Sequence, residues 1–214
     1  NSNLSCNNVL LMKMDPNGDT LWTRVYGESG GQTGRSVLET PDSGFIICGT
    51  AAGAISVPWN SGEDIILVKT DNNGNMLWSK AYGGYSNEGQ TKTLVLDDDG
   101  FLIVGYTCSF GITDTTIPDG NLDCANIYAI RTDENGDTLW SRVYSSKNGM
   151  EIDYPLDCIK LSDGNFLITG KTGYSTNLRA VFLLKITPQD TIVWSKVYKN
   201  VVNTGLAIIE NNDS

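Results

Sequence analysis

Hydrophobic and polar residues alternate in short runs along most of the chain, and turn residues separate these runs. In residues 76–82, for example, alternate side chains fall on opposite faces of a strand, and both faces carry apolar atoms. The run at residues 65–69 ends at Asp-Asn-Asn-Gly, a typical hairpin turn because Asn and Gly tolerate positive φ. The pattern predicts an all-β protein built from short strands.

One segment recurs four times, beginning at Val9, Ile65, Ile127 and Val181. Each copy has a first strand, a turn, and a second strand in which a Trp is followed four residues later by a Tyr. The Asp-x-Asn-Gly turn is present in the first three copies and lost in the fourth, at residues 187–190. The recurring pairs are Trp22 and Tyr26, Trp78 and Tyr82, Trp140 and Tyr144, and Trp194 and Tyr198, with Trp spacings of 56, 62 and 54 residues.

Two further strands follow in each complete repeat, and the fourth begins with Phe and ends with Gly. Four antiparallel strands per repeat predict a β-propeller of four-stranded antiparallel blades, whose apolar faces are buried only by stacking. A β-sandwich is the alternative, but it does not need such strict repetition. The expected parts of one propeller domain are an N-terminal stub at 1–8, blades at 9–63, 64–126 and 127–180, and an incomplete blade at 181–214.

The repeat resembles known families. The Gly and Trp of Asp-x-x-Gly-x-x-x-Trp are spaced as in the tryptophan-docking propellers of quinoprotein dehydrogenases, a distant likeness. The longer pattern continues with x-x-x-Tyr and later Asp-x-Gly-Phe-x-x-x-Gly, and it more closely resembles repeat propellers of secreted and cell-surface bacterial proteins. The resemblance implies a propeller in which the indole packs between blades. It implies little about function, because propellers host many activities.

The last repeat ends early. Its first two strands are clear and a third is expected at 206–210, but the final Gly-Phe strand is missing. Because propellers close with about 4 to 8 blades, either residues 1–8 complete a four-bladed ring or the chain is a fragment of a larger ring. We expect the larger ring, with further blades in the same polypeptide.

The chain has five cysteines, an odd number, so in an oxidising compartment one of them has no internal partner. Cys108 and Cys124 flank the long insert between the second and third repeats, where we predict a loop-closing disulfide; two free thiols are the alternative. Cys6 holds the equivalent place before the first repeat, so its partner would lie in a preceding blade. Cys48 and Cys158 lie in apolar strands and are expected to be buried. No Cys-x-x-Cys spacing supports a zinc site.

Charge and composition exclude some partners. The net charge is -10 and the isoelectric point is near 4.4, which opposes binding to nucleic acid or anionic membranes. No apolar run is long enough for a membrane span, so no membrane insertion is expected. The richness in Asn, Ser, Thr and Gly favours an extracellular or cell-surface location.

Candidate catalytic residues are lacking. The chain has no His, which excludes Ser-His-Asp triads, His bases and His-ligated metals. Most of its 25 acidic residues fall in the turns of the repeat, where carboxylates bind local backbone. We therefore predict no catalytic site, no cofactor and no metal site, apart from weak calcium binding at Asp-rich turns such as residues 97–99.

Loop lengths point to one face of the expected propeller. Loops joining strands one to two and three to four are short and uniform, whereas the other loops are long and differ between repeats. Because variable loops on a fixed scaffold often carry recognition, we predict that these loops bind a protein or glycan. The candidate contact residues are Trp59, Tyr85, Phe110, Asp114, Asp119, Glu151, Asp153 and Tyr174.

Two functions remain open from the sequence. We prefer a non-catalytic extracellular recognition or scaffold module that binds a protein or glycan through the long-loop face. The alternative is the propeller portion of a secreted enzyme, a quinoprotein-like dehydrogenase or a polysaccharide-processing protein, whose catalytic residues lie outside this chain.

Overall fold

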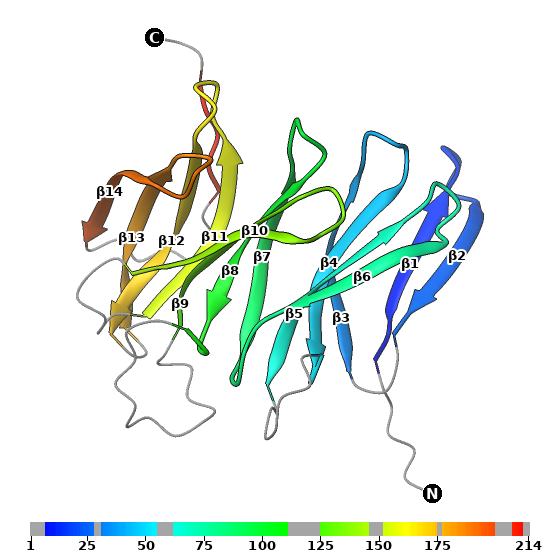
Figure 1. Cartoon of the computed structure of the whole chain (residues 1–214), viewed down its shortest axis with the longest axis horizontal. Coiled ribbons are helices and arrows are strands. Elements are labelled where there is room, and N and C mark those ends of the chain that lie inside the picture. The colour runs from blue at the N-terminus through cyan, green and yellow to red at the C-terminus, as the bar shows by residue number, and fades with distance from the viewer. Residues whose placement is uncertain are drawn as a thin grey trace, which may run out of the picture. The chain divides into compact units, whose positions relative to one another are not determined.

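The computed structural model describes residues 7–27, 31–54, 62–110, 125–145, 152–174, 177–199 and 207–211. Residues 90, 91, 174 and 177–179 are described by their backbone alone. Within these ranges the chain is all-β and contains no helix, and so none that is long and apolar enough to cross a membrane (Figure 1).

The described residues form 14 strands in four antiparallel sheets. In chain order the strands are β1 (Val9–Met14), β2 (Thr20–Tyr26), β3 (Gln32–Glu39), β4 (Phe45–Ala52), β5 (Glu63–Thr70), β6 (Met76–Tyr82), β7 (Glu88–Val95), β8 (Phe101–Thr107), β9 (Asn126–Thr132), β10 (Thr138–Tyr144), β11 (Ile152–Lys160), β12 (Phe166–Tyr174), β13 (Asn177–Ile186) and β14 (Ile192–Lys199).

The sheets are offset by two strands from the predicted blade boundaries. Besides the two-stranded β1-β2 sheet, the sheets have the strand orders β3-β4-β5-β6, β7-β8-β9-β10 and β11-β12-β13-β14. The Gly-Phe strand of one repeat pairs with the first strand of the next, as Gly49 does with Ile66 and Gly105 with Tyr128. The predicted segments 9–63, 64–126 and 127–180 are therefore sequence repeats that each span two sheets, whereas the described strands of 181–214 belong to the β11-β12-β13-β14 sheet alone.

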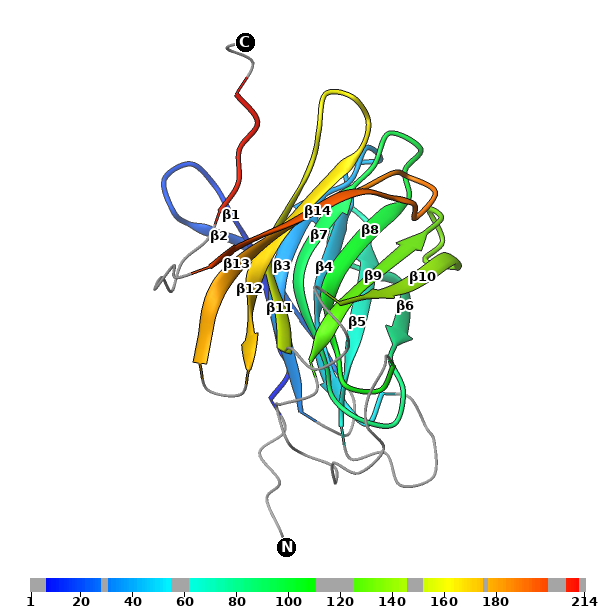
Figure 2. The same cartoon turned by 90° about the vertical axis from the view of Figure 1, so that its left-hand side faces the viewer.

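The chain divides into two compact units, which are described separately below. Unit 1 is Asn1–Gly89 and holds β1 to β6, and unit 2 is Gln90–Ser214, so the division falls within β7. Figure 2 shows from the side the strands β11 to β14, which form one sheet of unit 2.

The Asp-x-Asn-Gly turns form as predicted. Gly18, Gly74 and Gly136 have φ between 76° and 91°, the left-handed region that glycine enters without cost. In the second turn Asp71 accepts hydrogen bonds from the backbone N–H groups of Asn73 and Asn75, both at 2.8 Å. Its carboxylate is thus committed to the turn. The hydrogen bond from the Asn75 side-chain amide, together with these two from the backbone, lowers its pKa.

The fourth copy keeps this turn although its sequence has changed. Thr187 takes the place of the Asp, and its hydroxyl accepts hydrogen bonds from the backbone N–H groups of Gln189 and Thr191. Asp190 takes the place of the Gly at φ 68°. Asp tolerates this region better than most residues, so the hairpin does not require the Gly that the sequence pattern emphasised.

Each unit has its own apolar core. In unit 1, Val9, Leu11 and Tyr26 of the β1-β2 sheet pack with Ile47 and Val68 of the β3–β6 sheet. The core of unit 2 is larger and joins its two sheets; its most deeply buried members include Leu102, Ala129, Cys158, Ile168 and Ile186. Within each unit, therefore, neighbouring sheets bury their apolar faces against each other.

Candidate functional site

The recurring Tyr ties one sheet to the next within each unit. The Tyr26 hydroxyl donates a hydrogen bond to the Gly74 carbonyl at 2.7 Å in unit 1. The Tyr144 hydroxyl donates to the Asp190 carbonyl at 3.2 Å in unit 2. Both acceptors occupy the last position of the same hairpin turn. Burial raises the pKa of both phenols, so each stays protonated and able to donate.

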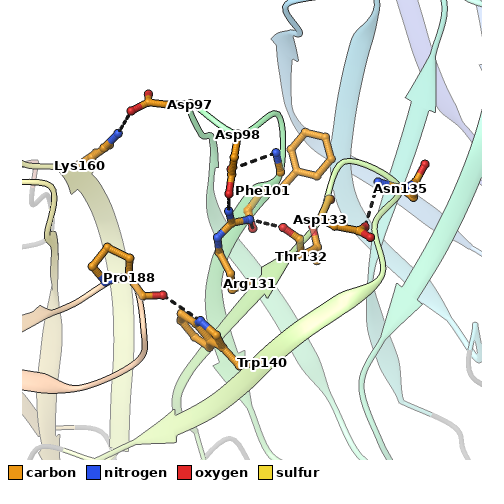
Figure 3. Close-up of polar contacts among 11 residues, drawn as sticks. Asp97, Asp98, Phe101, Arg131, Thr132, Asp133, Asn135, Trp140, Lys160 and Pro188 are labelled. Carbon is orange, nitrogen blue, oxygen red and sulfur yellow. Dashed lines mark hydrogen bonds and ion pairs between the residues drawn. The ribbon is translucent and has the colours of Figure 1, made fainter.

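The recurring Trp makes a second connection in unit 2. The Trp140 indole Nε1–H donates to the Pro188 carbonyl at 3.0 Å, from β10 to the β13–β14 turn (Figure 3). In unit 1 the Trp22 ring lies edge-on to Phe45 of the neighbouring sheet, with centroids 6.0 Å apart. The Trp-Tyr pair is therefore a structural link between sheets, and it frames a space between them.

In unit 1 that space is an open groove of about 850 Å³. It lies between β2 and the sheet containing β4 to β6, and it runs from the β5–β6 turn to the end of β4. We call it the unit 1 groove. Its lining residues are Val9, Arg24, Val25, Tyr26, Gly27, Gln32, Ala51, Ala52, Gly53, Ala54, Ile66, Val68, Gly74, Asn75, Met76, Ser79, Lys80 and Ala81.

The equivalent space in unit 2 is nearly filled. Only about 30 Å³ remains between β10 and the β13-β14 hairpin. The pairing registers align Ile66 with Phe182, and the Trp registers align Ala81 with Val197. At each of these positions unit 2 has the larger side chain, as it does with Leu184 in place of Val68. The larger side chains of unit 2 thus occupy part of the space that stays open in unit 1.

The charged groups also differ between the unit 1 groove and the equivalent space in unit 2. In unit 2, Arg142 Nε donates to the Asp190 carboxylate at 2.8 Å. In unit 1 the position of Asp190 is held by Gly74, which has no side chain. Arg24 donates instead to the Thr23 carbonyl at 3.0 Å, and its guanidinium lies 5.4 Å from the centroid of the Trp22 ring. The unit 1 groove therefore presents a half-buried cation.

A polar group lies at the other end of the unit 1 groove. The side-chain oxygen of Gln32 is buried and accepts no hydrogen bond among the residues that the structure describes. A methyl group added at Gly27 would lie 2.0 Å from this oxygen and 2.6 Å from Asn8 Oδ1. Glycine at position 27 therefore leaves room for two amide side chains at this end.

Three of the eight predicted contact residues have described side chains. Tyr85 is 68% exposed. Phe110 is 38% exposed, and its ring packs on Tyr128 with centroids 5.6 Å apart. Asp153 is fully buried, and its backbone N–H donates to the Ala125 carbonyl, so its predicted role as a surface contact is wrong. Tyr174 ends β12 and is described by its backbone alone; Trp59, Asp114, Asp119 and Glu151 lie outside the described residues.

Two buried carboxylates were missed by sequence reasoning. Asp64 and Glu88 are both fully buried, and a methyl group added at Gly83 would lie within 2.6 Å of an oxygen of each. Glu88 accepts a hydrogen bond from the Gly84 N–H at 2.9 Å. The Glu88 carboxylate thus holds the backbone of the segment after β6. The repeat register offers a signal, because Gln32, Glu88 and Asp153 hold equivalent positions.

A recurring ion pair was also missed. Lys69 is buried and binds the Asp42 carboxylate at 2.7 Å. Arg131 binds Asp98 in the same way (Figure 3), and Lys185 binds Asp163. A methyl group added at Gly44 would lie 2.6 Å from Lys69 Nζ, so this Gly is needed for the approach of the cation. The signal was the basic residue that recurs in the first strand of each repeat.

The structure describes some of the cysteines for which a disulfide bond or burial was predicted. Cys108 is in a disulfide bond, and its predicted partner Cys124 lies outside the described residues. Cys6 also lies outside them. Cys48 and Cys158 are buried as predicted. Burial raises the pKa of the Cys158 thiol, which keeps it protonated and unreactive.

Among the described residues, no group of three or more Cys, Asp or Glu side chains is placed to hold a metal ion. No protein-family model matches the chain. No curated protein matches it either. One similar solved structure is a protein of unknown function from Bacteroides caccae; it is 10% identical, and the match covers 89% of this chain and 73% of that chain with a TM-score of 0.42.

Proposed function

We propose that the chain is part of a β-propeller that serves as a non-catalytic recognition module of an extracellular or cell-surface protein, and that the unit 1 groove is part of its binding surface. The recurring four-stranded sheets, which stack within each unit through Trp and Tyr, support the propeller. The binding partner expected from the sequence is a protein or a glycan.

The open groove is the observation that carries this function. Protein interiors are close-packed, and an unfilled space forgoes the contacts that would stabilise it. Unit 2 shows that the same frame can be filled, leaving about 30 Å³ against about 850 Å³ in unit 1. A volume of several hundred Å³ is typical of ligand sites. The small side chains of unit 1 thus maintain a space of ligand size.

A filling variant tests the proposal. Ile66→Phe combined with Ala81→Val gives unit 1 the residues that close the groove in unit 2. The labelled full chain and this variant are applied to peptide and glycan arrays, and we expect the variant to lose about tenfold or more of the signal on the ligands that wild type binds.

The matched control is Val193→Phe, which adds a ring at an exposed position of β14 that lines neither the unit 1 groove nor the equivalent space in unit 2. It should bind like wild type, and thermal unfolding should show that both variants fold. If the filled variant binds the arrays as strongly as wild type does, the groove is not part of the binding surface.

A further inference from the structure

We propose that the unit 1 groove takes an acidic peptide in extended conformation, with Arg24 as the anchor for one of its carboxylates. This inference rests on the proposed function and adds the chemical class of the ligand. It follows from a cation that lacks the partner of its repeat equivalent, two strand edges, and an aliphatic lining.

Arg24 is the charged group that distinguishes the groove. Its equivalent in unit 2, Arg142, is paired with Asp190. In unit 1 the position of Asp190 is held by Gly74, which supplies no carboxylate. A methyl group added at Gly74 would lie 2.7 Å from Arg24 Cγ, so the Arg24 side chain passes directly over this turn. One of its five donors reaches Thr23. A ligand carboxylate would replace the one that Asp190 supplies in unit 2, in the planar geometry that guanidinium favours.

Asp71 is the acidic neighbour of Arg24. The Arg24 charge contributes to lowering the pKa of Asp71, but hydrogen bonds from Asn75 and Asn73 contribute more. The Asp71 carboxylate accepts two backbone N–H groups and the Asn75 side-chain amide, all within 2.8 Å. Asp71 is therefore held by its own turn, and the groove keeps a cation for a ligand.

The strands on the two sides favour an extended peptide. β2 ends the β1-β2 sheet and β6 ends the β3–β6 sheet, and residues 24–26 and 79–81 of these strands line the groove. An extended segment can add to such an edge through backbone hydrogen bonds. Its side chains then alternate, with acids on one face and apolar groups on the other.

The lining favours small aliphatic side chains over sugar rings. Ala51, Ala52, Ala54 and Ala81 line the groove together with Ile66. The aromatic side chain in the lining, Tyr26, is 8% exposed and offers no flat ring to a sugar. Because the chain carries a net charge of -10, attraction for an acidic peptide must come from contacts within the groove rather than from the overall field.

Fluorescence anisotropy of a labelled peptide tests the inference. The probe is acetyl-Glu-Val-Glu-Ala-Glu-Val-Glu-amide, titrated with the full chain, and the matched probe has Gln in place of each Glu. We expect Arg24→Gln to weaken binding of the acidic probe about tenfold and to leave the Gln probe unchanged. The control Arg142→Gln should bind both probes like wild type.

Substitution of Gly74 provides a second test. Gly74→Asp places beside Arg24 the carboxylate that Asp190 supplies in unit 2, whereas Gly74→Asn gives the same shape without the charge. Both residues tolerate the φ of 76° better than most, so the backbone strain is matched. We expect Gly74→Asp to bind the acidic probe about tenfold more weakly than Gly74→Asn does.

The outcomes separate the two proposals. If the filled groove loses its array ligands but Arg24→Gln keeps binding the acidic probe, the groove remains a site and the acidic anchor is wrong. Binding of an oligogalacturonate without binding of the acidic peptide would replace the peptide with an acidic glycan. If the filled groove keeps its array ligands, the proposed function itself fails.

Discussion

The junction between β2 and the β5-β6 hairpin in unit 1 has the same frame as the junction between β10 and the β13-β14 hairpin in unit 2. In both, a Tyr hydroxyl binds the last carbonyl of the neighbouring turn. One junction keeps a groove of about 850 Å³ and the other about 30 Å³. The frame thus comes from the recurring residues, and the two junctions differ in side-chain volume and charge at the positions that vary.

The largest difference between the junctions should appear when core volume is removed. Phe182 is 2% exposed and lies in the core of unit 2, so Phe182→Ala should cost about 3–5 kcal/mol of unfolding free energy. Ile66 holds the equivalent position in the open groove and is half-buried, so Ile66→Ala should cost about 1–2 kcal/mol. Urea unfolding of both variants measures the difference. Equal losses would mean that the groove is closed in solution.

The shared Tyr hydrogen bond should give the next largest effect. Tyr26→Phe removes a buried hydrogen bond and leaves the Gly74 carbonyl without this donor, which should cost about 1–2 kcal/mol. Tyr144→Phe removes a longer bond, at 3.2 Å against 2.7 Å, and should cost about 0.5–1.5 kcal/mol. Thermal unfolding of both variants tests whether the two junctions share one frame. A neutral Tyr26→Phe variant would contradict this.

Much of this frame was visible in the sequence. The spacing of Trp, Tyr and the Gly-containing turns predicted the strands, and the all-β class and the turns are confirmed. The grouping of strands was wrong, because a repeat pattern has no phase: any strand can be read as its first. Pairing of Gly49 with Ile66 across a repeat boundary fixes that phase. It is a long-range contact that periodicity alone does not specify.

The candidate site was less predictable. Loop length directed attention to residues such as Tyr85, whereas the groove depends on volumes of strand residues that look interchangeable in sequence. Ala81 and Val197 both satisfy the apolar pattern, and Gly74 and Asp190 both satisfy the turn. Their consequences appear only where strands distant in sequence pack together. Asp153 shows the converse, since a carboxylate next to a variable loop proved to be buried.

A smaller effect on stability is expected when the pH is lowered. The hydrogen bonds from Lys69 and Thr40 lower the pKa of Asp42 from 3.8 to about 2. Because the folded pKa is the lower one, the stabilisation is complete above about pH 4 and is lost as the pH falls from about 4 to about 2. The Asp42 side chain is 57% exposed, so Asp42→Asn should cost less than about 1 kcal/mol at pH 7.

The matching residue in unit 2 sharpens this test. Asp163 has a pKa lowered to about 2, chiefly by its hydrogen bond with Lys185. Asp163→Asn should therefore flatten the stability profile over the same pH range as Asp42→Asn does. Thermal unfolding at several pH values between about 2 and 7 measures both. A profile unchanged by either substitution would show that these carboxylates have ordinary pKa values.

The smallest effect concerns the charge that separates the two junctions. The Arg142 side chain is 60% exposed, so its pair with Asp190 should contribute about 0.2–1 kcal/mol, and Arg142→Gln should lose this amount. Arg24→Gln should change stability less, because Gly74 offers no carboxylate. A double-mutant cycle combines Arg24→Gln with Gly74→Asp. The coupling free energy between Arg24 and the introduced Asp should equal that of the Arg142–Asp190 pair. A coupling near zero would mean that Arg24 does not reach the place that Asp190 fills in unit 2, and the acidic anchor would have to be sought elsewhere in the groove.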